Sequence, residues 1–107
     1  MGKWVLVGKM SDFAEGEPLI HDFDYETAAL FRVGDNVYAI EDRCTHDDGP
    51  LADGEFDPTT CQISCPRHGA RFDITTGKVL SMPASEDVPT YPVKVEDGNV
   101  FVEEPEE

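Results

Sequence analysis

Two short clusters of metal-binding side chains stand out in this chain of 107 residues. Cys44-Thr45-His46 and Cys65-Pro66-Arg67-His68 each supply one thiolate and one imidazole, and 18 residues separate His46 from Cys65. Two sulfur and two nitrogen donors suit either a zinc ion or an iron–sulfur centre with histidine ligands. A finger-type zinc site groups its cysteines before its histidines, whereas here each loop carries one of each. That order favours a two-iron cluster in which one iron takes both cysteines and the other both histidines.

Turn-forming residues surround both pairs. Gly49, Pro50 and Gly54 follow the first pair, while Pro66 and Gly69 lie within or directly after the second. Glycine and proline at these positions place the four ligands on loop tips, where a rigid scaffold commonly presents functional groups. A chance grouping of buried thiols and surface imidazoles is therefore a poor explanation of the pattern.

The two stretches resemble those of the Rieske family, and in particular the Rieske-type ferredoxins of bacterial ring-hydroxylating dioxygenase systems. The resemblance covers essentially the whole chain and rests on residues 44–54, residues 65–73, Thr76-Gly77 and Pro83-Ala84. It implies an all-β fold, a Rieske-type antiparallel β-sandwich with a small cluster-binding subdomain made of the two ligand loops. It also implies one [2Fe-2S] cluster per chain.

Residue by residue, the resemblance implies Cys44 and Cys65 as the ligands of an inner iron. It implies His46 and His68 as the ligands of an outer iron nearer the solvent. Pro83 would lie in a third loop that covers the cluster.

Four positions separate this chain from other Rieske proteins. Membrane-complex members carry an extra cysteine in each ligand loop, and the two form a disulfide; this chain has Gly49 and Arg67 there. High-potential members donate hydrogen bonds from a serine and a tyrosine hydroxyl at the positions of Ala70 and Phe72. The resemblance therefore implies the soluble, disulfide-free branch and a potential toward the low end of the family's range.

The resemblance implies an electron carrier that passes one electron at a time from a flavin-dependent ferredoxin reductase to a terminal Rieske oxygenase or another acceptor protein. The sequence offers no open coordination position and no nucleophile paired with a base, so we expect no catalysis by this chain itself. Two alternatives remain open. One is the small subunit or electron-transfer component of another reductase, such as nitrite reductase, and the other is a structural zinc domain.

Length and charge agree with a single small carrier. A chain of this size buries about 60–65% of its unfolded surface, enough for one core, so we expect one domain over 1–107 with a cluster-binding module at about 42–84. The formal charge of −15 argues against nucleic acid or an anionic membrane as partner and favours a basic protein surface. Three cysteines without a secretory signal indicate the cytoplasm. We expect a monomer.

Apolar alternation and turn residues predict an all-β chain. The turns at 34–36 and 97–99 predict two hairpins. The expected strands cover 4–7, 18–21, 29–33, 37–40, 61–65, 71–74, 91–95 and 100–102.

Several conspicuous side chains receive structural interpretations. We expect core positions for four aromatic residues on the strand patterns, Trp4, Phe31, Tyr38 and Phe101. Cys61, outside both ligand pairs, is interpreted as a partly buried strand residue, and His21 as a strand histidine without a metal. We expect the acidic residues 103–107 to form a frayed tail.

Overall fold

The computed structural model describes residues 3–14, 16–24, 26–45, 49–67, 69–82 and 84–105. In these residues the chain forms strands and loops apart from one short turn of 3₁₀ helix, η1 (Met10–Asp12), so the expected all-β class is confirmed. No helix among them is long and apolar enough to cross a bilayer. The strands are β1 (Lys3–Lys9), β2 (Leu19–Asp22), β3 (Thr27–Val33), β4 (Asn36–Glu41), β5 (Phe56–Asp57), β6 (Gln62–Ser64), β7 (Arg71–Asp73), β8 (Thr90–Tyr91), β9 (Val93–Glu96) and β10 (Asn99–Glu104).

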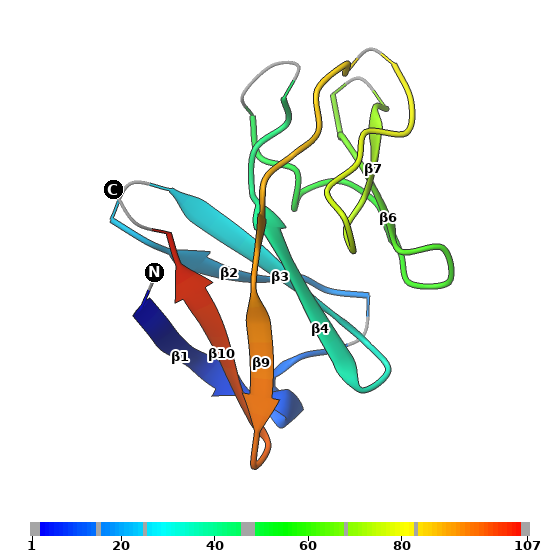
Figure 1. Ribbon diagram of the computed structural model, residues 1–107. Coiled ribbons are helices and arrows are strands. Elements are labelled where there is room, and N and C mark those ends of the chain that lie inside the picture. The colour runs from blue at the N-terminus through cyan, green and yellow to red at the C-terminus, as the bar shows by residue number, and fades with distance from the viewer. Residues whose placement is uncertain are drawn as a thin grey trace.

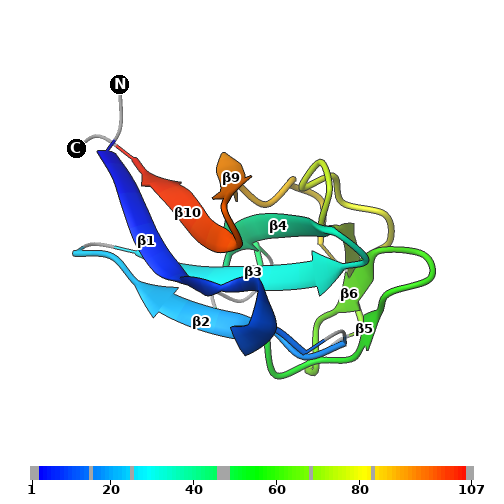
Figure 2. The ribbon, with the colours of Figure 1, turned by 90° about the horizontal axis from the view of Figure 1, so that it is seen from below.

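The strands form three antiparallel sheets, with the orders β1-β10-β9, β2-β3-β4-β8 and β5-β6-β7. The first two sheets make the base of the molecule, and the third belongs to a smaller module that packs against the face of the middle sheet opposite the first sheet (Figures 1 and 2). This agrees with a sandwich that carries a smaller subdomain.

Strand β3 lies between two separate cores. Ala28 and Leu30 pack in the core of the base, together with residues of β10 such as Val102. Ala29 and Phe31 pack in the core of the module. Because successive side chains of a strand point to opposite faces, an unbroken apolar run can serve both cores. The cluster-binding module is thereby fixed to the base through a strand buried on both faces.

The two predicted hairpins are confirmed, with turns one residue shorter than expected. Val33 pairs with Asn36 across Gly34-Asp35, and Gly34 has a φ of +62°. In the second hairpin Asp97 and Gly98 have φ angles of +52° and +78°, the combination that a type I′ turn requires. Each asparagine after these turns therefore begins a strand.

The expected strand at 91–95 is wrong, since the chain changes sheets at Pro92. Tyr91 pairs with Ala39 of the middle sheet, whereas Val93 pairs with Val102 of the first sheet. Proline has no N–H to donate and suits such a break. Val95, the last residue of the expected strand, is 41% exposed.

Two expectations at the ends of the chain are corrected. Trp4 is 38% exposed on β1, a strand at the edge of its sheet, and the Lys94 ammonium lies 4.6 Å from the centre of its ring. Glu103 and Glu104 are part of β10, where they pair with Trp4 and Lys3, so a free tail begins no earlier than residue 105. An edge strand buries its aromatic residue less completely than a central one.

The remaining core predictions are met to different degrees. Phe31 is fully buried, as expected, while Tyr38 and Phe101 are only partly buried. Cys61 is partly buried but lies in a turn directly before β6, with a φ of +58°, and not in a strand.

Candidate metal centre

The structure describes two of the four sequence-predicted ligands. Cys44 follows β4 by three residues and Cys65 directly follows β6. His46, His68 and the predicted loop residue Pro83 lie outside the described residues. Among the residues that are described, no three cysteine, histidine, aspartate or glutamate side chains group closely enough to hold a metal.

The two cysteine side chains lie in one apolar core. They are 0% and 2% exposed, and neither forms a disulfide. Their common surroundings in the module are the buried side chains of Leu51, Ile63, Ala70, Phe72, Ile74 and Ala84. Two thiols from loops far apart in sequence, held in a water-poor core, fit the cysteine side of an iron–sulfur centre with one inner and one outer iron.

The two ligand loops are closed in the same way. The N–H of Cys44 donates to the carbonyl of Gly49 at 2.7 Å, and the N–H of Cys65 donates to the carbonyl of Ala70 at 2.7 Å. In the second loop, the N–H of Gly69 also donates to the carbonyl of Cys65 at 2.9 Å, and Gly69 has a φ of +76°. Each cysteine N–H thus donates to the carbonyl of the residue five positions later.

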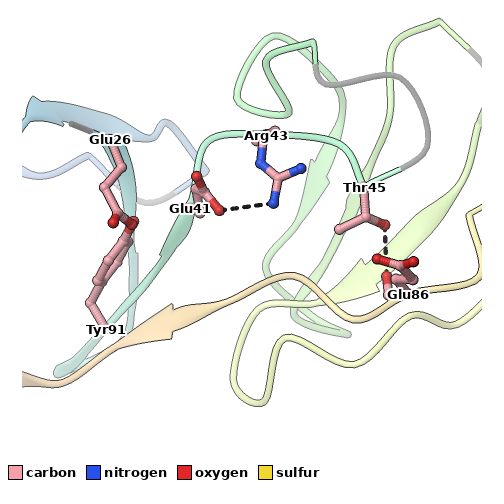
Figure 3. A network of polar contacts seen from close by, with 6 residues as sticks. All are labelled: Glu26, Glu41, Arg43, Thr45, Glu86 and Tyr91. Carbon is pink, nitrogen blue, oxygen red and sulfur yellow. Dashed lines mark hydrogen bonds and ion pairs between the residues drawn. The ribbon is translucent and has the colours of Figure 1, made fainter. Parts of the chain in front are cut away.

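Two polar side chains anchor the first loop. One carboxylate oxygen of Asp42 accepts hydrogen bonds from the N–H groups of Leu51 and Ala52, at 2.8 and 2.7 Å. The Thr45 hydroxyl donates to the carbonyl of Glu86 at 2.7 Å (Figure 3). The first loop is thus held at its base and tied to the segment that follows Pro83.

Close backbone contact fixes the second loop against the residues after the first. A Cβ atom at Gly54 would overlap the Ser64 carbonyl oxygen, so only glycine permits this approach directly before Cys65. Arg67 Nη2 donates to the carbonyl of Pro50 at 3.1 Å, which joins the two loops directly. The loops lie at the same end of the molecule, opposite the β9–β10 turn (Figure 1).

A polar network lies where β4 leads into the first loop. The Tyr91 hydroxyl donates to the Glu26 carboxylate at 2.5 Å, and Arg43 forms an ion pair with Glu41 at 3.3 Å (Figure 3). Burial, and then the hydrogen bond and negative charge of Glu26, raise the pKa of Tyr91 well above its usual range. The tyrosine therefore remains a neutral donor throughout the physiological pH range.

Cys61 and His21 do not belong to the two ligand loops, although Cys61 packs against the module core that contains Cys44 and Cys65. Burial, followed by the charges of Asp73 and Asp57, raises the pKa of the Cys61 thiol. A thiol with a raised pKa is a weaker nucleophile and a weaker metal ligand at neutral pH. His21 lies on β2, with its ring 4.9 Å from the ring of Phe23.

Comparison with known proteins identifies similar chains across nearly the full length. Residues 3–92 match the Rieske [2Fe-2S] domain. The 3-phenylpropionate/cinnamic acid dioxygenase ferredoxin subunit of Escherichia coli strain K12 is 41% identical over 97 residues, covering 91% of this chain and 90% of that protein. The ferredoxin of carbazole 1,9a-dioxygenase from Nocardioides aromaticivorans IC177 has a TM-score of 0.89 and 33% identity, covering 94% of this chain and 96% of that one.

Two further solved structures are similar to this chain. In the complex of reduced oxygenase and oxidized ferredoxin of carbazole 1,9a-dioxygenase, the matching chain has a TM-score of 0.86 and 35% identity, covering 94% of this chain and 92% of that one. A protein described as the small subunit of an NADH-dependent nitrite reductase from Mycobacterium tuberculosis has a TM-score of 0.85 at 20% identity, covering 99% of this chain and 98% of that one. At that identity the likeness concerns the fold alone.

Proposed function

Since the chain belongs to the Rieske [2Fe-2S] domain family, we propose that it is the ferredoxin component of a ring-hydroxylating oxygenase system. In this role it receives single electrons from a flavin-dependent ferredoxin reductase and delivers them to a terminal Rieske oxygenase. It is an electron-transfer protein and not itself an enzyme.

The observation that carries this proposal is similarity over whole chains. The Escherichia coli relative is a dioxygenase ferredoxin subunit, and its 41% identity extends over nine-tenths of both proteins. The ferredoxin that matches in the carbazole 1,9a-dioxygenase complex is bound to an oxygenase. A chain of the same length and fold, with the same cofactor family, is suited to the same kind of partner.

We propose the four sequence-predicted residues as the cluster ligands, and the burial of the two cysteines supports their part of this assignment. Cys44 and Cys65, buried in the module core, would bind the inner iron, and His46 and His68 would bind the outer iron. When bound, the cluster accepts one electron, and histidine ligation removes negative charge from one iron so that the electron resides there. The apolar core keeps water from the thiolates, while the closed loops hold the two cysteine backbones in place.

The other functions expected from the sequence receive less support. A structural zinc domain disagrees with membership of a [2Fe-2S] family. The nitrite reductase likeness extends only to the fold, whereas dioxygenase ferredoxins match at 33–41% identity. We further propose that the protein acts as a monomer in the cytoplasm, where three cysteines without disulfides remain reduced.

The ligand assignment is tested by iron and sulfide analysis together with electron paramagnetic resonance of the reduced holoprotein. We expect two irons and two sulfides per chain and an average g value below that of all-cysteine clusters. Cys61→Ser should keep this signal, while Cys44→Ser and His68→Ala should lose it. Retention of the signal in His68→Ala, or its loss in Cys61→Ser, would contradict the assignment.

A further inference from the structure

We propose that Arg67 is a positioning residue whose guanidinium clamps the two ligand loops together by lying against Gly49. The inference rests on the proposed function, because the loops that it joins carry the proposed cluster ligands. It adds a role for two residues that bind no metal themselves.

The geometry places the Arg67 side chain across the gap between the loops. Arg67 lies two residues after Cys65, and its Nη2 donates to the Pro50 carbonyl at 3.1 Å, 17 residues away in sequence. A Cβ atom at Gly49 would overlap the Cζ, Nη2 and Nε atoms of Arg67 together. These three atoms belong to the planar guanidinium group, so the face of the guanidinium lies against the backbone of Gly49.

The backbone does not require glycine at position 49. Six described glycines have positive φ angles, and Gly49 is not among them. Alanine could therefore adopt its conformation without strain. A side chain at this position would meet the Arg67 guanidinium, which is the end of a flexible and exposed side chain, and would displace it. At Gly69, by contrast, φ is +76° and the space around the Cβ position is open. Gly49 thus serves the contact with arginine and not the turn.

The contact acts on the residue that closes the first ligand loop. The Gly49 carbonyl accepts the hydrogen bond from the N–H of Cys44 at 2.7 Å. A guanidinium held at Gly49 and at the next carbonyl, that of Pro50, supports this closure from the second loop. It also places a permanent positive charge between the loops, since arginine does not deprotonate in proteins. Such a charge favours the more negative, reduced state of a centre held there.

A double-mutant cycle on the holoprotein tests the contact. The rate at which the visible absorbance bleaches in excess iron chelator would be measured for the wild type, Gly49→Ala, Arg67→Met and the double variant. Each single change should accelerate cluster loss about tenfold, which corresponds to roughly 1.4 kcal/mol. The double variant should lose its cluster no faster than Arg67→Met, because alanine meets nothing once the guanidinium is gone. If the accelerations of cluster loss in the two single variants multiply in the double variant, the proposal is overturned.

The reduction potential separates this role from a general effect on folding. Arg67→Met should lower the potential, whereas Arg67→Lys, which keeps the charge but loses the planar fork, should hold it near the wild-type value while still accelerating cluster loss. An unchanged potential in Arg67→Met would contradict a charge held between the loops. If Arg67→Met does not retain its cluster, Gly49→Ala and Arg67→Lys still test the contact. Cluster loss at the wild-type rate in both of these variants would refute it. Absence of the Rieske-type resonance in the wild type would instead refute the proposed function.

Discussion

Ala70 and Phe72 are buried neighbours in the second ligand loop and the strand that follows it, and neither side chain carries a hydroxyl group. Both are 0% exposed, and the Ala70 carbonyl accepts the hydrogen bond from Cys65 N–H at 2.7 Å. A hydroxyl at either position would lie in an apolar core with few competing partners. It could therefore donate to sulfur and stabilise the added electron.

We expect Ala70→Ser and Phe72→Tyr each to raise the reduction potential by tens of millivolts. A hydrogen bond to a charged group contributes about 1.5–3 kcal/mol, of which the part that depends on the redox state is a fraction. The wild type should lie toward the low end of the Rieske range of about −150 to +300 mV. Protein-film voltammetry measures both quantities.

A hydroxyl elsewhere in the module provides the control. Phe56→Tyr adds the same group on β5, which lies on the opposite side of β6 from β7, and should leave the potential unchanged. An unshifted potential in the Ala70→Ser, Phe72→Tyr double variant, or a wild-type value well above zero, would speak against this reading of the two positions.

At this scale, the sequence reveals the residues that do chemistry but not the residues that support them. The cysteine and histidine ligands can be predicted because binding the cluster requires these residue types at this spacing. Asp42 and Thr45 hold backbone groups 9 to 41 residues away, and no pattern distinguishes them from the other acidic and hydroxyl residues of the chain. The role of Gly49 likewise depends on a side chain from a different loop.

Among the elements, β8 shows how a two-residue strand is held in place. Tyr91 pairs with Ala39 of β4 and donates from its hydroxyl to Glu26, which precedes β3. The buried phenol and the partly buried carboxylate thus connect β8 to the residue before β3, near the start of the first ligand loop (Figure 3).

Tyr91→Phe should destabilise the holoprotein by about 1.5–3 kcal/mol at pH 8, because the Glu26 carboxylate loses its donor. The folded wild type holds the tyrosine proton at a raised pKa, while the unfolded chain releases it near pH 10. Wild-type stability should consequently fall as the pH rises past about 10, and the difference from Tyr91→Phe should narrow. Anaerobic urea unfolding at pH 8 and pH 10.5 measures this difference.

Tyr38→Phe provides a matched control, since it removes a hydroxyl from a partly buried tyrosine in the same sheet. This variant keeps the hydrogen bond between Tyr91 and Glu26 and therefore measures the effect of losing a tyrosine hydroxyl without that contact. A Tyr91→Phe difference that is constant between the two pH values would mean that the raised pKa does not contribute to stability.

The hairpins could be predicted from the sequence because a turn is a local structure. Gly34-Asp35 and Asp97-Gly98 contain the residues that tight turns require, whatever surrounds them. The separate strands β5 and β8 could not be predicted, since each has two residues and exists only through its partner strand. For the same reason, the sequence around Pro92 predicts one continuous strand, although the chain changes sheets there.

For the whole molecule, the dominant property is the charge of −15, the difference between 8 basic and 23 acidic residues. Such a charge should steer encounters with a basic partner surface over a distance set by the salt concentration. Asp47 and Asp48, in the sequence directly after His46, are the carboxylates that we expect to contribute most. Asp35 lies in the turn at the other end of β4 and offers a matched change of charge.

The most direct test of the carrier role is anaerobic stopped-flow transfer from the reduced holoprotein to the terminal oxygenase of a ring-hydroxylating system. We predict one electron per chain, with a second-order rate that falls as the Debye length shortens from about 30 Å to about 8 Å. Asp47→Lys should slow the transfer at low salt more than Asp35→Lys does. A reduced protein that fails to reduce any such oxygenase, or a rate independent of salt, would contradict an electrostatically steered electron carrier.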